Sequence, residues 1–264
     1  IVFPMLHGPF GEDGTIQGLL EMANLAYVGS GVLASAVAMD KSFAKPIFAS
    51  HGIATAPGIV IKESEWKRDK STLSTKIAAL GYPVFVKPAR GGSSRGTSKV
   101  KSDTELEQAM QAAFTFDSKV LVEVAIVGSE IECAVLEIDG KVRASIPGKV
   151  SIDPKYEFYD FEAKYLDGAT DIIVPAPIEK EILEKVQHAA IAAFQALGCS
   201  GLARVDFFLT QDGQIIINEL NTMPGFTTTS VFPKMWAASG IKFTEVITHL
   251  LETALTRTNG TLGN

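Results

Sequence analysis

The segment from residue 201 to residue 221 constrains the fold most strongly. Residues 201–210 and 214–221 alternate apolar and polar side chains on either side of Asp212-Gly213. A period of two is typical of half-buried β-strands, and Asp-Gly favours a two-residue hairpin turn. The cross-strand pairs that this turn predicts on one face are Asp206 with Glu219 and Arg204 with Asn221.

The polar face of this hairpin predicts a metal site. Two carboxylates that face each other across a strand pair repel, so Asp206 opposite Glu219 indicates a cation between them. With Asn221 the donors are all oxygens, which suits Mg²⁺, one or two ions held jointly by the protein and phosphates, with Mn²⁺ as an alternative. The competing interpretation is a solvated face with scattered charges. The opposite face favours the cation, because it is apolar throughout: Val205, Phe207, Leu209, Ile216 and Leu220.

Composition limits the class of protein. With 264 residues and 46% hydrophobic content the chain can bury a large core, as one domain or as two to three lobes. A net charge of −6 argues against an extended nucleic-acid surface. We find no apolar run long enough for a membrane span and no signal peptide, and the only cysteines, Cys133 and Cys199, form no zinc-binding pattern. We therefore expect a cytoplasmic protein with reduced thiols, without nucleic-acid or membrane partners.

Helices and strands alternate along the chain, which predicts an α/β fold. The predicted helices cover about 15–24, 32–39, 42–51, 102–113, 179–197, 232–238 and 244–254. The predicted strands cover 1–6, 59–61, 84–87, 119–124, 130–138 and 141–146, besides the hairpin above. We expect a solvated linker or an exposed helix start at 62–70, and a long functional loop without regular elements at 148–171.

A glycine-rich loop at 91–96 is a candidate anion site. Glycines let backbone N–H groups approach an anion closely, and Ser93 and Ser94 add hydroxyl donors. The strand before the loop ends in Lys87, which is a suitable partner for a phosphate. The loop matches neither the P-loop nor the dinucleotide fingerprint, so a plain mobile turn remains the alternative.

Six motifs in a fixed order now resemble one family. They are His7-Gly8 with Gly11-Glu12-Asp13-Gly14-Thr15, Met39-Asp40-Lys41, Val86-Lys87-Pro88 with Gly92-Ser93-Ser94, Phe158-Tyr159-Asp160 with Ala163-Lys164-Tyr165, Arg204-Val205-Asp206, and Asn218-Glu219-Leu220-Asn221-Thr222-Met223-Pro224-Gly225. Together they resemble the motifs of D-alanine–D-alanine ligases, which belong to the ATP-grasp superfamily. They cover nearly the whole chain, and the ordered set is far more specific than any one piece.

The resemblance implies an α/β protein with α+β lobes, an ATP-grasp fold preceded by the C-terminal part of a Rossmann-like N-terminal domain. The expected division is residues 1–40 for the rest of that substrate-binding domain, 41–127 for the central lobe, and 128–264 for the C-terminal lobe with the metal site and a mobile loop at 148–171. Because the chain starts within an expected strand, we also expect a segment upstream of Ile1.

The resemblance also implies roles for individual residues. The implied nucleotide contacts are Lys41, Lys87, Ser94, Glu123, Glu130, Lys164 and Phe208. The implied metal ligands are Asp206, Glu219 and Asn221. His7 and Glu12 line the D-alanine site, and the implied catalytic group comprises Ser93, Tyr165, Arg204, Gly225 and Ser230. The alternative for an isolated residue such as His7 is a structural role, which we also expect of His51, His188 and His249.

The implied reaction joins two D-alanines at the expense of ATP, through a D-alanyl phosphate, to give D-alanyl-D-alanine for peptidoglycan precursors. Alternatives are a D-alanine–D-lactate ligase, another ATP-grasp carboxylate–amine ligase, or a truncated nucleotide-binding chain that no longer ligates. Tyr165 in its Glu-Ala-Lys-Tyr context favours the dipeptide. The implied partners are D-alanine and ATP, and the family suggests a homodimer.

Overall fold

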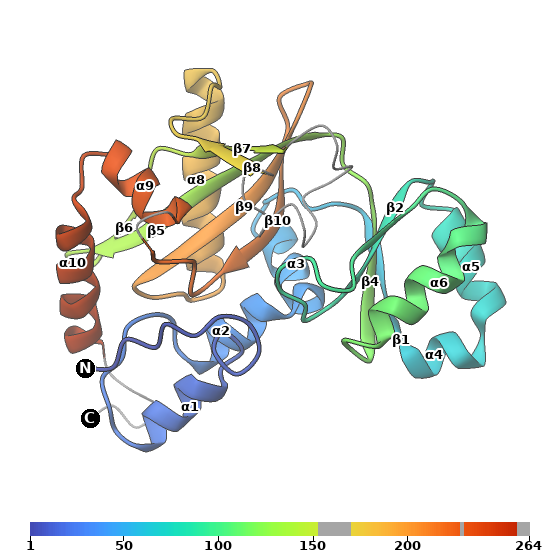
Figure 1. Ribbon diagram of the computed structural model, residues 1–264, viewed down its shortest axis with the longest axis horizontal. Helices are drawn as coiled ribbons and strands as arrows, with labels where there is room; N and C mark the ends of the chain where they lie inside the picture. Colours follow the sequence, from blue (N-terminus) through green and yellow to red (C-terminus); the bar gives the residue numbers. More distant parts are fainter. Residues whose placement is uncertain (153–169, 228–229, 258–264) are drawn as a thin grey trace.

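The computed structural model of this chain describes residues 1–152, 170–227 and 230–257, and it contains two β-sheets (Figure 1). The smaller sheet has the order β1-β4-β2-β3, with strands Gly58–Lys62, Lys119–Val124, Val84–Pro88 and Ser98–Val100. The larger sheet has the order β10-β9-β5-β7-β8, and β6 pairs with β5 beside this path. Its strands are β5 Gly128–Ile138, β6 Lys141–Ala144, β7 Gly148–Ile152, β8 Thr170–Ile173, β9 Leu202–Thr210 and β10 Ile215–Asn221. Every pairing between these strands is antiparallel.

Three helices complete the smaller lobe. They are α4 Glu63–Arg68, α5 Lys70–Ala78 and α6 Asp103–Phe114. Helix α6 turns Leu106 and Met110, one helical turn apart, onto the sheet, where alternate strand residues such as Val86 and Val122 are fully buried. This alternation is what the strand predictions required, and it gives the lobe a core of its own.

Of the two alternatives expected for residues 62–70, the exposed helix start is confirmed by α4 and α5, and the linker is wrong. A linker was one of the two alternatives, but Trp66 is buried in the core of the smaller lobe and anchors α4 there. Glu65 accepts a hydrogen bond from the N–H of Lys62 at the start of α4, and Asp69 accepts one from the N–H of Thr72 at the start of α5. Because α4 is mostly charged and Trp66 is its one large apolar side chain, the sequence pattern did not indicate that the helix packs on the core.

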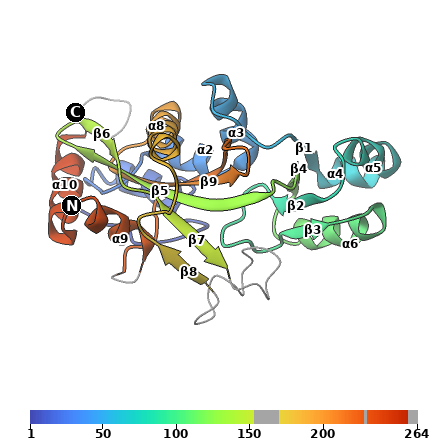
Figure 2. The ribbon, with the colours of Figure 1, turned by 90° about the horizontal axis from the view of Figure 1, so that it is seen from above.

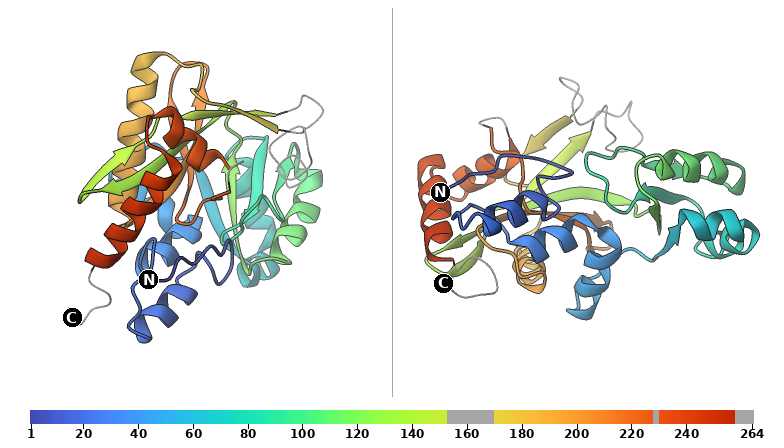
Figure 3. Two further views of the ribbon diagram at one scale, coloured as in Figure 1. Left: turned by 60° about the vertical axis from the view of Figure 1, so that its left-hand side comes forward. Right: turned by 90° about the horizontal axis from the view of Figure 1, so that it is seen from below.

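Strand β5 is the centre of the larger sheet and is covered on both faces. Ile131, Cys133 and Val135 pack toward α8 (Lys180–Ala196), whereas Ala134 and Leu136 pack toward the helices at the end of the chain. Those are α9 (Val231–Ala238) and α10 (Phe243–Thr256). Figure 2 shows β5 extending from this covered region toward the smaller sheet. In the right-hand view of Figure 3, α10 and the helices α4 to α6 lie at opposite ends of the molecule.

The N-terminal residues pack against the larger sheet. Helices α1 (Thr15–Met22), α2 (Val32–Met39) and α3 (Lys41–Ser50) follow the first loop, and Phe48 of α3 is buried in the same core as β5 and α8. The expected strand at 1–6 is reduced to one parallel bridge between Val2 and Tyr27. Helix α3 thus packs with the larger sheet, although we expected residues 41–127 to form one lobe, and the three-part division stays a prediction.

The stretch 148–171, expected to lack regular elements, is bordered by two strands. Strands β7 and β8 pair in antiparallel fashion, from Lys149 with Ile173 to Ile152 with Thr170. Both strands are short and the sequence that separates them is polar, so the pattern did not predict them. Residues 153–169 lie outside the described part of the chain. In the described part, no helix combines the length and apolarity needed to cross a bilayer.

The hairpin of β9 and β10 reaches the expected pairing by an unexpected route. Asp206 pairs with Glu219, and Arg204 pairs with Asn221, as predicted. The turn is nevertheless three residues long, because the N–H of Thr210 donates to the carbonyl of Gln214. A register shift between Ile217 and Glu219 then leaves Asn218 as an extra residue, a β-bulge that restores the pairing. The longer turn also puts Ile217 rather than Ile216 in the core, because the bulge restores the expected faces only after Ile217.

Candidate active site

A cavity of about 490 Å³ lies between the two sheets. The smaller sheet contributes Phe85, Lys87 and Glu123, and the larger sheet contributes Lys149 and Phe208 among others. The crossing segment between β4 and β5 closes one side. The predicted nucleotide contacts and metal ligands among its lining residues are Lys41, Lys87, Ser94, Glu123, Glu130, Phe208 and Glu219. These motif residues therefore meet in one place, although they come from separate elements. Two predicted metal ligands, Asp206 and Asn221, are not among the residues that line this cavity.

Strand register sets the polar floor of the site, of which Glu130 and Glu219 line this cavity. Glu130 pairs with Phe208 across β5 and β9, and two residues further along Glu132 pairs with Asp206. On the other side of β9, Asp206 pairs with Glu219. Paired residues share a face of the sheet, so three carboxylates lie in one row across three strands.

Arg204 and Asn221 both hold Asp206. Nε and one terminal nitrogen of Arg204 donate to the two carboxylate oxygens of Asp206, each at 2.7 Å, and Nδ2 of Asn221 donates to Oδ2 at 3.0 Å. Burial works against the charge of Arg204, yet Asp206, Glu132 and Glu219 together raise its pKa well above the ordinary value. Arg204 is thus a fixed positive charge beside the row of carboxylates.

Lys41 brings a second positive charge to this row. It stands at the start of α3, where Asp40 is the N-cap and accepts from the N–H of Ser42. Its Nζ lies 2.7 Å from a carboxylate oxygen of Glu219 and donates to the carbonyl of Gly91 at 3.0 Å. Burial lowers the pKa of Lys41, but the nearby carboxylates outweigh it and the pKa is raised.

A third group surrounds Glu123, which is almost completely buried. One of its oxygens lies 2.5 Å from Nζ of Lys45 and the other 2.5 Å from Nζ of Lys87, and this pairing lowers the pKa of Glu123 against the effect of burial. Lys87 also donates to Oδ1 of Asn218 at 3.2 Å. Burial, assisted by the charges of Lys87 and Lys41, lowers the pKa of Lys45 to about 8.

Sequence reasoning missed three residues of this site. Lys45 lies one helical turn after Lys41, so the spacing could have placed both on one face of α3. Glu132 lies two residues after Glu130 in a strand, which could have placed both on one face. Asn218 begins the last of the quoted motifs, but its position in the cavity depends on the bulge, which the sequence did not predict.

The glycine-rich loop is a left-handed turn at the edge of the cavity. Ser93 and Ser94 have φ values of 52° and 56°, and Gly96 has a φ of 71°. Non-glycine residues in this region are strained, and such strain gathers at functional loops. Ser94 lines the cavity and Ser93 stands next to it in the loop. This geometry favours the anion-site interpretation over a plain turn.

His7 and Glu12 tie the first loop to the segment after β10. Nδ1 of His7 lies 2.8 Å from the carbonyl oxygen of Met223. The N–H of Met223 donates to a carboxylate oxygen of Glu12 at 3.3 Å. Glu12 also accepts from the N–H of Gly8 at 2.6 Å. Burial raises the pKa of Glu12 despite these hydrogen bonds. A small second cavity brings Glu12 together with Gly92, Glu219 and Asn221.

Gly225 and Ser230 lie side by side beyond β10. A Cβ on residue 225 would stand 2.9 Å from Oγ of Ser230, so a side chain there would displace that hydroxyl. The same Oγ accepts from the N–H of Thr227 at 3.0 Å. The two other predicted site residues, Lys164 and Tyr165, lie outside the described residues.

The donor set on the floor fits a hard divalent cation. Asp206, Glu219 and Asn221 supply oxygen atoms from two neighbouring strands, which is the chemistry that Mg²⁺ prefers. In the structure, Arg204 and Lys41 neutralise the two carboxylates. The cation that the opposed pair requires is thus supplied by side chains here, and a metal ion would have to share these carboxylates with them.

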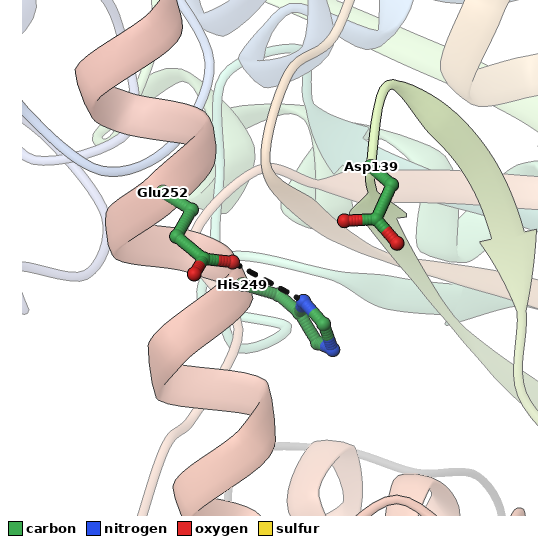
Figure 4. Close-up of side chains that lie close together, drawn as sticks. All are labelled: Asp139, His249 and Glu252. Carbon is green, nitrogen blue, oxygen red and sulfur yellow. Dashed lines mark ion pairs between the residues drawn. The ribbon is translucent and has the colours of Figure 1, made fainter.

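A second group of possible metal ligands lies far from this cavity. Asp139, in the turn between β5 and β6, approaches His249 and Glu252 of α10, and Figure 4 shows the three side chains together. His249 lies 3.6 Å from a carboxylate oxygen of Glu252. Both carboxylates are exposed at the surface, where acidic groups are commonly solvated. We assign no metal ion to this group.

A cavity between two sheets, with lysines facing a row of carboxylates, defines the class of this protein: it has the ATP-grasp fold. The solved structure of the VanG D-Ala:D-Ser ligase from Enterococcus faecalis superposes with a TM-score of 0.87 at 39% identity, covering 96% of this chain and 72% of that one. The structure of the D-alanine-D-alanine ligase from Coxiella burnetii gives a TM-score of 0.84 at 38% sequence identity, and the match covers 96% of this chain and 67% of that one.

Sequence comparisons identify the family. The family model for the D-ala D-ala ligase C-terminus matches residues 47–252, and the one for the N-terminus matches residues 1–30. The chain is 52% identical to the D-alanine–D-alanine ligase of Arthrobacter sp. (strain FB24), over 98% of this chain and 69% of that protein. The D-alanine–D-alanine ligase of Streptomyces coelicolor is 50% identical, over 98% of this chain and 68% of that protein. This chain belongs to the D-alanine–D-alanine ligase family.

Proposed function

We propose that this protein uses ATP to join two D-alanines into D-alanyl-D-alanine for peptidoglycan precursors. The observation that carries the proposal is the cavity between the two sheets, which is lined by Lys41, Lys87 and Glu219. Asp206 pairs with Glu219 on the neighbouring strand. The chain shares about half its residues with relatives that bear the name of this reaction.

The first step is the activation of a carboxylate. A free carboxylate resists attack by an amine, so the carboxylate of the first D-alanine must attack the γ-phosphate of ATP to give a D-alanyl phosphate and ADP. Lys41 and Lys87 neutralise phosphate charge, and Phe208 with Glu123 and Glu130 surrounds the base and ribose. Mg²⁺, held by Asp206, Glu219 and Asn221, supplies further charge neutralisation on the phosphates when bound.

The second step is attack by the amine of the second D-alanine on the acyl phosphate. The tetrahedral oxyanion that forms is stabilised by Arg204 and by the N–H of Gly225, a contribution of about 3–4 kcal/mol for each donor. Phosphate then leaves. Ser230 holds the carboxylate of the second D-alanine, while His7 and Glu12 line the D-alanine site. Ser94 contacts the phosphates from the glycine-rich loop.

The segment 148–171 covers the reacting groups in this proposal. By resemblance to the family, we assign Lys164 to the γ-phosphate and Tyr165 to the substrates. Exclusion of water matters because water would hydrolyse the acyl phosphate before the amine attacks. We place the enzyme in the cytoplasm, where ATP is available, and as a homodimer by analogy with the family.

A second candidate differs only in the second substrate. The VanG D-Ala:D-Ser ligase shares the fold at 39% identity, so D-serine is an alternative acceptor. D-lactate is another, in which a hydroxyl replaces the amine. A site that hydrogen-bonds one of these acceptors rejects an analogue that cannot form the same bond.

Phosphate release from ATP, measured with each candidate acceptor, tests the proposal. We expect release only when D-alanine is present, with no stimulation by L-alanine and with D-alanyl-D-alanine as the main product from mixtures containing D-serine or D-lactate. Release that ignores D-alanine, or nucleotide binding without any turnover, would refute ligation. A mixed product with D-serine or D-lactate in excess would favour the second candidate.

A further inference from the structure

Glu132 stands next to the site that we propose, yet the proposed mechanism gives it no part. It is 4% exposed, belongs to β5 and pairs with Asp206 in the register of β5 and β9. One of its carboxylate oxygens lies 3.4 Å from Nε of Arg204. A buried carboxylate at that distance from a buried guanidinium is a second counterion for Arg204, on the opposite side from β10.

Asp206 cannot serve Arg204 and a metal ion equally. Both of its oxygens accept hydrogen bonds from Arg204 at 2.7 Å, and one of them also accepts from Asn221. A divalent ion that binds these oxygens draws their electron density and weakens the bonds to Arg204. A guanidinium that lost its only partner would turn away from the floor, because a buried charge without a partner is costly.

We propose that Glu132 is a positioning residue that keeps Arg204 on the floor of the site when the metal ion engages Asp206. Arg204 moves its main ion pair from Asp206, on its own strand β9, to Glu132 on the neighbouring strand β5. Its positive charge stays where the oxyanion forms. The inference rests on the proposed metal-binding role of Asp206. The row of three carboxylates then divides into two ligands for the metal and one for the arginine.

The exchange of the Arg204 Nε proton with water reports this transfer directly. The probe is Mg²⁺ with ADP, added to protein carrying ¹⁵N-labelled arginine, and the Arg204 signal is assigned by its loss in Arg204→Lys. In the wild-type protein we expect the Nε proton to stay protected when Mg²⁺ and ADP bind. In Glu132→Gln we expect its exchange to become at least about tenfold faster in the bound state, the size expected for losing a charged hydrogen-bond partner.

Glu137→Gln is the matched control. Glu137 lies on the same strand and accepts hydrogen bonds from Ser200 and from the N–H of Gly201, away from Arg204. Its replacement should leave the Arg204 signal unchanged in both states. Turnover adds a second readout: Glu132→Gln should lower kcat with little change in the KM for ATP, and Glu132→Asp should restore most of kcat.

The outcomes separate this inference from the proposed function. Binding of Mg²⁺ and ADP with loss of Arg204 protection in the wild-type protein would overturn the inference alone, and this measurement needs no folded variant. Equal protection in the wild-type protein and in Glu132→Gln would overturn it as well. If calorimetry detects no binding of Mg²⁺ and ADP, the proposed function falls and the inference falls with it.

Discussion

Two hairpins of the larger sheet carry the same Asp-Gly dipeptide and use it differently. Between β5 and β6, Ile138 pairs with Lys141, and Asp139 and Gly140 form a two-residue turn with φ values of 52° and 69°. Between β9 and β10 the loop has three residues, and Gly213 has a φ of 81°. Asp212 there accepts hydrogen bonds from the side chains on either side of the loop, Thr210 and Gln214.

The longer loop would be harmful without the bulge that follows it. A slip of one residue moves every later side chain to the other face, which would put Glu219 in the core. The extra residue Asn218 reverses the slip and at the same time directs an amide to Lys87. The regular hairpin packs between helices, whereas the irregular one carries the site, as expected when bulges re-aim side chains beside a functional centre.

The largest effect should come from Asp206→Asn in the irregular hairpin. The change removes a metal ligand and the main counterion of Arg204, so we expect turnover to fall by at least about a thousandfold. Circular dichroism should still show a folded protein, because Glu132 remains beside Arg204. Turnover within about tenfold of the wild-type rate would show that the polar face is structural, and the contrast between the hairpins would disappear.

The regular hairpin should respond in the opposite way. Glu137→Gln removes a charge that accepts two hydrogen bonds, so we expect the free energy of unfolding to fall by about 2 kcal/mol. Turnover at a temperature where the variant is folded should match the wild-type rate. Denaturant unfolding and steady-state kinetics measure the two quantities, and a loss of turnover with unchanged stability would contradict the structural role of this hairpin.

Asn218→Ala tests the bulge itself. The variant keeps the backbone register but loses the oxygen that Lys87 contacts, so we expect the KM for ATP to rise by about tenfold. Deletion of Asn218 is the sharper companion, since it joins the pairs Ile217–Phe207 and Glu219–Asp206 without a bulge. An unchanged KM in both variants would mean that the bulge only corrects the register.

The smallest effect concerns Lys45, a positive charge near the irregular hairpin. Because the pKa of Lys45 is lowered to about 8, Lys45 loses its proton as the pH rises through that value. Nucleotide affinity should then fall by about threefold between pH 7 and pH 9, a limited loss because other lysines remain. Lys45→Met should flatten this dependence. A wild-type affinity that stays constant with pH would contradict the assignment.

Linkage gives Lys45 an independent check. Its folded pKa lies below the ordinary value of 10.5, so the unfolded chain binds more protons between about pH 8 and pH 10.5. The free energy of unfolding of the wild-type protein, compared with that of Lys45→Met, should therefore rise with pH across this window. A difference that stays constant or falls would show that Lys45 stays charged in the fold.

These hairpins also show what the sequence can predict. Alternation and motif order were enough for the fold, for the polar face of the hairpin and for the pairing of Asp206 with Glu219. That pairing was right for an incomplete reason, because we expected a two-residue turn and no bulge. The longer turn shifts the register by one residue and the bulge shifts it back, so the pairing of Asp206 with Glu219 is unchanged. Between these two irregularities the faces are exchanged, and Ile217 instead of Ile216 is buried.

The residues that the sequence did not reveal depend on tertiary contacts. Lys45 and Glu132 carry ordinary charges on a helix and a strand, and only tertiary packing buries them. The strands β7 and β8 were missed because polar residues separate them, and the lone Trp66 does not reveal α4 by periodicity. Local patterns predict elements, whereas burial of charge is decided by what packs against them.

The rate of D-alanyl-D-alanine formation, measured together with ADP release, tests the central claim most directly, that the irregular hairpin forms the centre of a D-alanine ligase. It should be measured side by side in the wild-type protein, Glu219→Gln and Glu137→Gln. We predict one dipeptide for each ADP in the wild-type protein and in Glu137→Gln, and almost no dipeptide in Glu219→Gln although the protein is folded. Dipeptide at the wild-type rate from Glu219→Gln, or none from the wild-type protein, would contradict the account.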